Sequence, residues 1–274
     1  DVGNISLNLI PFVICVPSSI FVGFLMYYLK LPRWFGPADT IYAAHHRAGI
    51  LDLKGGFGST LASFISISGG ASVGIYGPLV HFGATLATII SKLSGKFIRK
   101  DVLIACGAAA AISSGFGAPI AGIMFAHEAL LRRFSIGGLA PISVASIVAA
   151  ATNRYLFDEN LTFQVPSSDL DLVAVLPFVI IFAPICSGIA IFYMVALRSC
   201  QKVAASGKYQ FSTLIFGTAI MVGSIGVFVP EVLGLGNYEI NQMLSANYEL
   251  SFLLLLMTVK IFVTALCIGF GFFG

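Results

Sequence analysis

Long stretches without a charged side chain recur along this chain, and they constrain its fold more than any other feature. They cover Ser6–Leu29, Gly56–Ser91, Val102–Ala126, Phe134–Asn153, Leu172–Leu197, Phe211–Pro230 and, interrupted only by Lys260, Leu250–Gly274. A helix needs about 20 apolar residues to cross the hydrocarbon core of a bilayer. Because no water is available there to satisfy backbone groups, the pattern predicts an all-α integral membrane protein.

The composition excludes several other classes of protein. Of the 274 residues, 58% are hydrophobic and only 10% are charged, whereas a soluble domain usually carries about 25% charge. The net charge of +3 falls mostly in short connectors and gives no sign of nucleic-acid binding. Five cysteines lie in or beside apolar spans without metal-ligand spacing. We therefore expect no soluble domain, no metal site, no cofactor and, since no catalytic motif is present, no enzyme activity.

Two of the apolar stretches are broken by glycine and proline. The first is expected to form a helix to about Gly69, a break, and a second helix from about Gly77 to Leu93; the other breaks at Gly115–Pro119. The N-terminus of a half-helix at membrane depth carries unpaired N–H groups and partial positive charge, so it can bind an anion. The alternative is that these glycines only allow close packing of helices. We favour packing for Ala118–Pro119 and anion binding for Gly74–Pro78.

A polar segment at residues 158–171 divides the chain. Residues 1–157 and 172–274 are predicted to form two membrane parts joined by this connector.

Two segments resemble signatures of the CLC family of chloride channels and transporters. Gly69–Ala84 is similar to the family's GxxxG(R/K)EGPxVHxGA, and Cys106–Glu128 is similar to GAAAGxxxxFNAPxAGxxFxxE. The resemblance implies a CLC-like inverted-repeat bundle with discontinuous, re-entrant helices. It also implies a homodimer in a lipid bilayer. Since the resemblance is to the prokaryotic type of the family, the expected location is a bacterial inner or plasma membrane. Chloride is the implied substrate, with one pathway per subunit. The family's first two helices and its third signature have no counterpart, so the chain is expected to be truncated at both ends.

The implied anion pathway departs from the family at two places. Trp34–Thr40 is the counterpart of the family's GSGIP signature, and it puts Phe35 at the chloride-binding serine. In the second signature Tyr76 replaces the gating glutamate. A phenol stays neutral at pH 7, since its ordinary pKa is about 10, so it is a poor proton shuttle. The expected pathway residues are Phe35, Gly36, Pro37, Ala38, Asp39, Gly74, Ile75, Tyr76, Gly77 and Pro78.

A second proton-handling position is also altered. The resemblance places Glu128 at the first glutamate of the family's inner pair and Ala129 at the second, proton-transferring one. Passive chloride conduction without proton coupling is therefore predicted. Two alternatives stay open: a proton–anion antiporter in which His127, Glu128 or water relays the proton, and a non-conducting relative blocked by Phe35 and Tyr76.

Three other polar side chains have more than one interpretation. Glu128 is expected to pair with an arginine one turn further on, and His81 is expected to serve packing. Lys260, in the last apolar span, is expected either to attract anions or to be paired or snorkelling.

Overall fold

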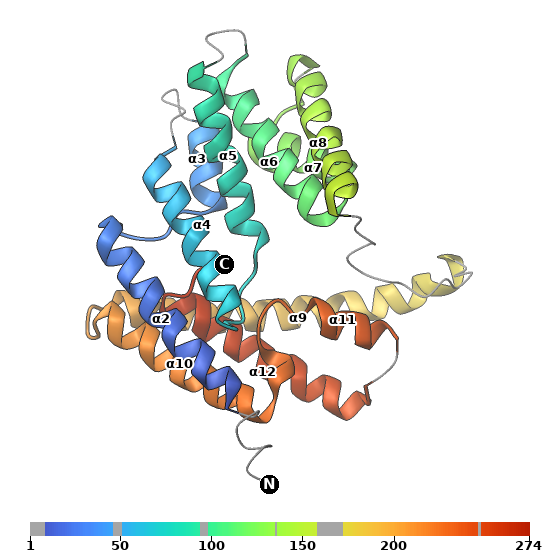
Figure 1. Cartoon of the computed structure of the whole chain (residues 1–274). Coiled ribbons are helices and arrows are strands. Elements are labelled where there is room, and N and C mark those ends of the chain that lie inside the picture. Colours follow the sequence, from blue (N-terminus) through green and yellow to red (C-terminus); the bar gives the residue numbers. More distant parts are fainter. Residues whose placement is uncertain (1–8, 46–50, 94–97, 135, 158–171, 246–247) are drawn as a thin grey trace. The chain divides into compact units, whose positions relative to one another are not determined.

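The computed structural model describes residues 9–45, 51–93, 98–134, 136–157, 172–245 and 248–274, and within these ranges the chain forms helices and no strands (Figure 1). The elements are α2 (Ile10–Leu29), α3 (Pro37–His45), α4 (Leu53–Ser68), α5 (Tyr76–Leu93), α6 (Lys100–Phe116), α7 (Pro119–Phe125), the π-helix η1 (Ala126–Leu131), α8 (Ile136–Phe157), α9 (Leu172–Ala205), α10 (Phe211–Phe228), the 3-10 turn η2 (Pro230–Val232), α11 (Asn237–Leu244) and α12 (Leu250–Phe270).

Among the described residues, five helices are long and apolar enough to cross a membrane. They are Ile10–Leu29, Ile136–Phe157, Val175–Ala205, Phe211–Phe228 and Leu250–Phe270. In α9 none of the residues of its most apolar window is buried, and Phe178 and Ile180 are more than 60% exposed. Exposed apolar surface of this extent needs lipid or protein to cover it. The prediction of an all-α integral membrane protein is confirmed.

The chain folds into two compact units that interleave along the sequence. One contains residues 1–23, 66–73 and 163–272, and the other contains residues 24–65, 74–162 and 273–274. The predicted connector at residues 158–171 lies outside the described residues. The division into two membrane parts at that connector therefore stays a prediction.

In the unit that contains α3 and α5 to α8, the core is built on small side chains. Helix α5 packs on α6, and α6 packs on α7 and α8 (Figure 1). The ideal Cβ of Gly107 would lie 2.6 Å from the Gly83 carbonyl carbon, so the two backbones touch at this crossing. Hydroxyl groups tie the neighbouring helices, since Ser113 Oγ donates to the Ser146 carbonyl (2.6 Å) and Ser146 Oγ donates to the Pro119 carbonyl (2.8 Å).

The predicted break before α5 is present and begins with a glycine in the left-handed conformation. Helix α4 ends at Ser68, and Gly70 has φ +81°. The Gly70 N–H bonds to the Ile67 carbonyl (2.9 Å) and the Ala71 N–H to the Ser66 carbonyl (3.0 Å), which is the Schellman pattern of a helix end. A residue with a Cβ is strained at that φ, so Gly70 allows the chain to leave the helix.

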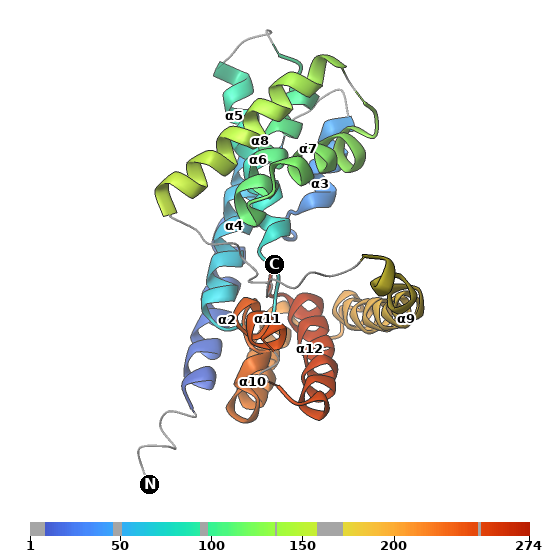
Figure 2. The same ribbon diagram turned by 90° about the vertical axis from the view of Figure 1, so that its right-hand side faces the viewer.

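In the other unit, α12 packs on α9 and α10 (Figure 2) and carries the lysine that the sequence left open. Lys260 Nζ donates to the carbonyls of Val232 (2.8 Å) and Gly234 (3.0 Å). The Gly234 N–H in turn donates to the Gly70 carbonyl (3.1 Å), and one helical turn along α12 the Thr264 hydroxyl bonds Ser72 Oγ (2.9 Å). Lys260 is therefore paired with backbone carbonyls, and with Thr264 it stabilises the non-helical residues 70–73.

We expect Lys260→Met to lower the free energy of unfolding by about 2 kcal/mol, because hydrogen bonds from a charged donor are lost. The check is thermal unfolding of the purified protein in detergent. Lys202→Met, at the exposed end of α9, is the control and is expected to leave the unfolding temperature unchanged. Equal stability of the two variants would show that the Lys260 bonds contribute nothing.

Candidate functional site

Three segments that are distant in sequence meet where α3 and α5 begin. The ideal Cβ of Gly77 would lie 3.4 Å from Pro37 Cγ and 3.9 Å from the Gly274 carbonyl oxygen. The ideal Cβ of Gly36 would lie 3.6 Å from the Phe273 ring. The structure thus brings the two predicted pathway segments, residues 35–39 and 74–78, into contact. Sequence reasoning had no signal for Phe273 and Gly274 as their neighbours.

The start of α5 presents backbone donors. The Leu79 N–H bonds to the Ile75 carbonyl (3.1 Å), so Ile75 is the residue that precedes the helix. Pro78 has no N–H, which leaves Tyr76 and Gly77 to supply the first N–H groups of the helix. Gly74 is exposed and Pro78 is buried. A helix start of this kind is attractive to an anion because its N–H groups and the helix dipole both favour negative charge.

Tyr76, the first residue of α5, packs flat on Phe116. The two ring centroids are 3.7 Å apart and the planes differ by 18°. The Tyr76 ring also covers Gly115, whose ideal Cβ would lie 3.0 Å from Tyr76 Cε1. The aromatic side chain at the start of α5 is therefore held against the C-terminal end of α6.

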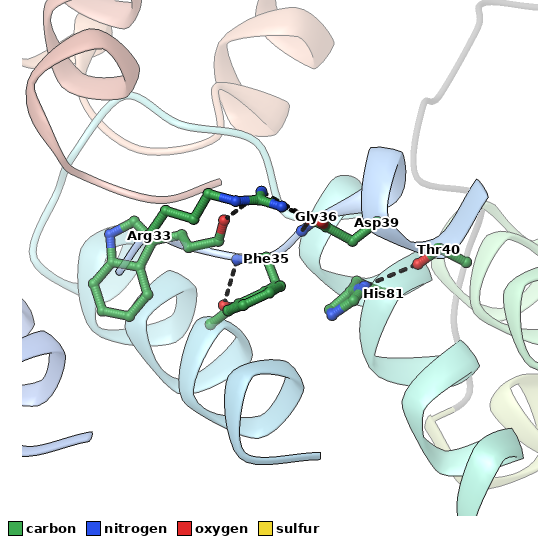
Figure 3. A network of polar contacts seen from close by, with 8 residues as sticks. Arg33, Phe35, Gly36, Asp39, Thr40 and His81 are labelled. Carbon is green, nitrogen blue, oxygen red and sulfur yellow. Dashed lines mark hydrogen bonds and ion pairs between the residues drawn. The ribbon is translucent and has the colours of Figure 1, made fainter. Parts of the chain in front are cut away.

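The segment that runs from Arg33 into α3, residues 33–40, is organised by polar contacts to its backbone (Figure 3). The Phe35 N–H donates to Ser59 Oγ (2.8 Å) on α4, and the Gly36 N–H donates to Asp39 Oδ2 (2.9 Å). Arg33 binds both oxygens of the Asp39 carboxylate, with Nη1 3.1 Å from Oδ2 and a second, shorter contact to Oδ1. The sequence predicted N–H donors in this segment but not the contacts of Ser59 and Arg33. The one sequence signal for the Arg33–Asp39 pair was an acidic residue six positions after an arginine.

The contacts of Asp39 favour its charged form. Burial opposes its charge, but the hydrogen bonds from Arg33 and from the Gly36 N–H outweigh that effect, so the pKa of Asp39 lies below its ordinary value. The start of α3 thus already holds a carboxylate.

His81, on α5, lies beside the same segment. Its side chain is 1% exposed, its Nδ1 is 2.8 Å from Thr40 Oγ1, and its ring is stacked beside Phe35 with centroids 6.4 Å apart. Its Nε2 has no hydrogen-bond partner among the described residues. The expected packing role of His81 fits this burial, although one ring nitrogen is left over.

The position implied for proton transfer lies in the π-helix η1. Ala129 is half-buried and carries only a methyl group. His127 is 1% exposed and stacks on Phe134, with ring centroids 5.0 Å apart and planes at 2°. The expected pairing of Glu128 with an arginine is wrong: within the described ranges Glu128 makes no ion pair, and Arg133 instead binds Asp101 (2.8 Å). The π-turn redirects the end of the helix, because it widens the spacing on which the expected pairing was based.

Metal ligation finds no support in the described part of the chain, where no three His, Cys, Asp or Glu side chains are grouped to hold an ion.

The described residues combine five membrane-length helices with a break between α4 and α5 that leaves a helix start lined by glycine and proline. Ion-transport proteins of the membrane use interrupted helices of this kind. The family model described as voltage gated chloride channel matches residues 18–274, so the chain belongs to that family.

Individual relatives include channels and exchangers. The chain is 28% identical over 230 residues to "Chloride channel protein CLC-f" of Arabidopsis thaliana. This alignment covers 77% of this chain and 29% of the relative. It is 26% identical over 215 residues to "H(+)/Cl(-) exchange transporter ClcA" of Vibrio cholerae. This alignment covers 75% of this chain and 46% of the relative. The chain thus spans less than half the length of either.

Two solved structures share the fold. A slow cyanobacterial Cl−/H+ antiporter matches with a TM-score of 0.78 at 17% identity, over 96% of this chain and 64% of that one. A CLC-type fluoride/proton antiporter matches with a TM-score of 0.68 at 23% identity, over 98% of this chain and 76% of that one. The CLC fold expected from the sequence is confirmed.

Proposed function

We propose that this protein conducts chloride passively, without proton coupling, along a pathway that passes the starts of α3 and α5. The observation that carries the proposal is the contact of these two helix starts, with Tyr76 at the first position of α5. Two helix starts side by side supply backbone donors that can replace part of an anion's hydration shell without a full positive charge. Such binding is weak enough for chloride to leave quickly.

Proton coupling lacks its usual carriers in this proposal. A glutamate at the position of Tyr76, with an ordinary pKa of about 4.3, releases its proton far more readily than a phenol, whose ordinary pKa is about 10. Ala129, at the inner position, has no proton to transfer. Among the described residues of the proposed pathway, Asp39 carries a carboxylate, and its pairing with Arg33 favours the charged form over a form that carries a proton.

The reversal potential of the full-length protein in a planar bilayer tests this proposal. Under a chloride gradient alone, a passive pathway reverses at the chloride equilibrium potential, and a pH gradient added across the bilayer shifts nothing. A shift of the reversal potential with the pH gradient would mean that protons move with chloride. Absence of any current from folded protein would favour the non-conducting alternative, with the pathway blocked by Phe35 and Tyr76.

A proton–anion antiporter is the second candidate, and His127 is the observation that favours it. The side chain is buried two residues before Ala129, and its Nε2 has no partner within the described residues. Histidine is the side chain whose ordinary titration lies nearest to neutral pH. If proton transport occurs and His127→Ala abolishes it while chloride flux continues, His127 is the relay.

The expected assembly also belongs to the proposal. We infer a homodimer in a lipid bilayer, with the exposed apolar residues of α9 in contact with lipid or with another part of the assembly. A membrane transport role, rather than an enzyme activity, follows from the family.

A further inference from the structure

An apolar groove runs along α6, and none of the proposed pathway residues lines it. Helix α6 packs on both α5 and α8, and side chains of these three helices enclose a volume of about 410 Å³. Small residues such as Gly107, Ala110 and Ala149 line the groove, while Leu86 and Ile90 on its α5 side are 37% and 53% exposed. The groove is therefore open along its length to whatever surrounds these helices.

The size of the groove favours a thin occupant. On α5 its lining residues run from Leu79 to Ile90, which is about 17 Å at 1.5 Å per residue. A helix about 10 Å across would fill about 1,300 Å³ over that length, roughly three times the volume of the groove. A helix would therefore lie over the groove rather than in it, whereas an unbranched acyl chain is thin enough to lie along it. Apart from Ser114, whose hydroxyl donates to the Ala111 carbonyl (3.2 Å), the lining side chains are apolar.

One end of the groove carries positive charge that the described residues do not neutralise. At the end of α5 and the start of α6, Lys92 and Lys100 are exposed, and neither makes an ion pair within the described ranges. The nearby arginines differ, because Asp101 pairs with both Arg99 (2.7 Å) and Arg133 (2.8 Å). The two lysines are thus available to an anionic group at this end of the groove.

Lys100 shares a helix face with the groove. It precedes Leu103, Gly107, Ala111 and Ser114 by 3, 7, 11 and 14 residues, and residues at this spacing follow one side of a helix. A lysine in the first turn also opposes the helix dipole, so stabilisation of α6 does not explain its position. The charge and the apolar surface therefore form one continuous strip.

We propose that this groove binds an anionic phospholipid, with one acyl chain along α6 and the phosphate of the headgroup at Lys100 and Lys92. Lipid tails of a bilayer are as apolar as the groove itself, so the acyl chain does not select one lipid over another. The lysines do, because a basic residue near the membrane surface favours an anionic lipid. This site is separate from the proposed chloride pathway and does not depend on it.

Photo-crosslinking locates the lipid. The full-length protein is placed in phosphatidylcholine liposomes that contain a small share of phosphatidylglycerol with a diazirine on one acyl chain; a matched sample carries the same chain on phosphatidylcholine. We expect phosphatidylglycerol to label the groove-lining peptides of α5, α6 and α8 more strongly than phosphatidylcholine does. Equal labelling by the two lipids overturns the proposal. Absence of label from the groove of folded protein also overturns it, and would mean that a second copy or another segment of the chain covers the groove.

Lys100→Gln tests the headgroup contact. We expect the dissociation constant of phosphatidylglycerol, measured by native mass spectrometry of the purified full-length protein, to rise about fivefold, because one cation near the headgroup is lost. Lys202→Gln, at the exposed end of α9, is the matched control and should bind as the wild type does. Equal binding by the Lys100→Gln and wild-type proteins overturns the proposal.

Ala149→Phe tests the acyl chain, because the added ring occupies the groove from the side of α8. It should reduce both the crosslinking and the binding of phosphatidylglycerol, whereas Ala183→Phe, at an exposed position of α9, should change neither. Unchanged binding in folded Ala149→Phe overturns the placement in the groove. If Ala149→Phe does not fold, Lys100→Gln and the position of the crosslinks decide. None of these measurements uses chloride flux, so their failure leaves the proposed function untouched.

Discussion

Replacing Tyr76 with alanine is expected to raise the chloride flux by about tenfold, which corresponds to a barrier lowered by about 1.4 kcal/mol. In the proposed pathway, the Tyr76 ring is the bulkiest group at the start of α5, and its stacking on Phe116 at 3.7 Å holds it in place. Alanine removes the ring and leaves the helix start and its backbone donors unchanged. The measurement is the initial rate of chloride efflux from liposomes that contain a known amount of the full-length variant.

Tyr76→Phe is the control for this experiment, because it keeps the stacked ring and removes only the hydroxyl group. A flux close to that of the wild type in Tyr76→Phe, with an increase in Tyr76→Ala, assigns the barrier to the ring. An increase of similar size in both variants would assign it to the hydroxyl. A flux that does not change in Tyr76→Ala, with normal folding, would contradict the placement of the pathway at the start of α5.

The second large effect is expected on folding, at the crossing of α5 and α6. In Gly107→Ala the added Cβ would meet the Gly83 carbonyl group, with its carbon at 2.6 Å, and the Ala87 Cβ at 2.9 Å. Because the opposing atoms are mainly backbone, the two helices must separate, and we expect a loss of about 3 kcal/mol in the free energy of unfolding. The unfolding temperature in detergent and the yield of monodisperse protein measure this loss.

Gly217→Ala, in the middle of α10, gives the opposite expectation. No atom lies within 4 Å of the ideal Cβ of Gly217, and alanine favours a helix over glycine by up to about 1 kcal/mol. This variant should be as stable as the wild type or slightly more stable. If Gly107→Ala tolerates heating as well as Gly217→Ala does, the close approach of α5 and α6 is not required for folding.

Much of the fold could be predicted from the sequence because its strongest signals are local. Charge-free stretches marked the membrane helices, and the glycine and proline around residue 74 marked a break that the structure places between Ser68 and Tyr76. The second break, expected at Gly115–Pro119, lies between Phe116 and Pro119. Both breaks depend on backbone properties of glycine and proline, which any context preserves.

Only part of the candidate site could be predicted from the sequence, because the rest depends on contacts between segments that are distant in sequence. Asp39 was expected to line the pathway, but its bond to the Gly36 N–H requires the coordinates of the turn. Ser59, whose hydroxyl accepts the Phe35 N–H, lies 24 residues further along the chain and belongs to no motif. The end of α7 continues as a π-helix, so the residue spacing used to pair Glu128 with an arginine did not apply.

Proton movement during chloride transport tests the central claim most directly. Liposomes containing the full-length protein are loaded with chloride and a pH indicator, diluted into low chloride with the membrane potential clamped, and both internal pH and chloride efflux are recorded. An uncoupled pathway predicts chloride efflux with no change in internal pH beyond that of empty liposomes. Protons driven against their gradient in fixed ratio to chloride would contradict it, and would show that Tyr76 and Ala129 do not prevent coupling.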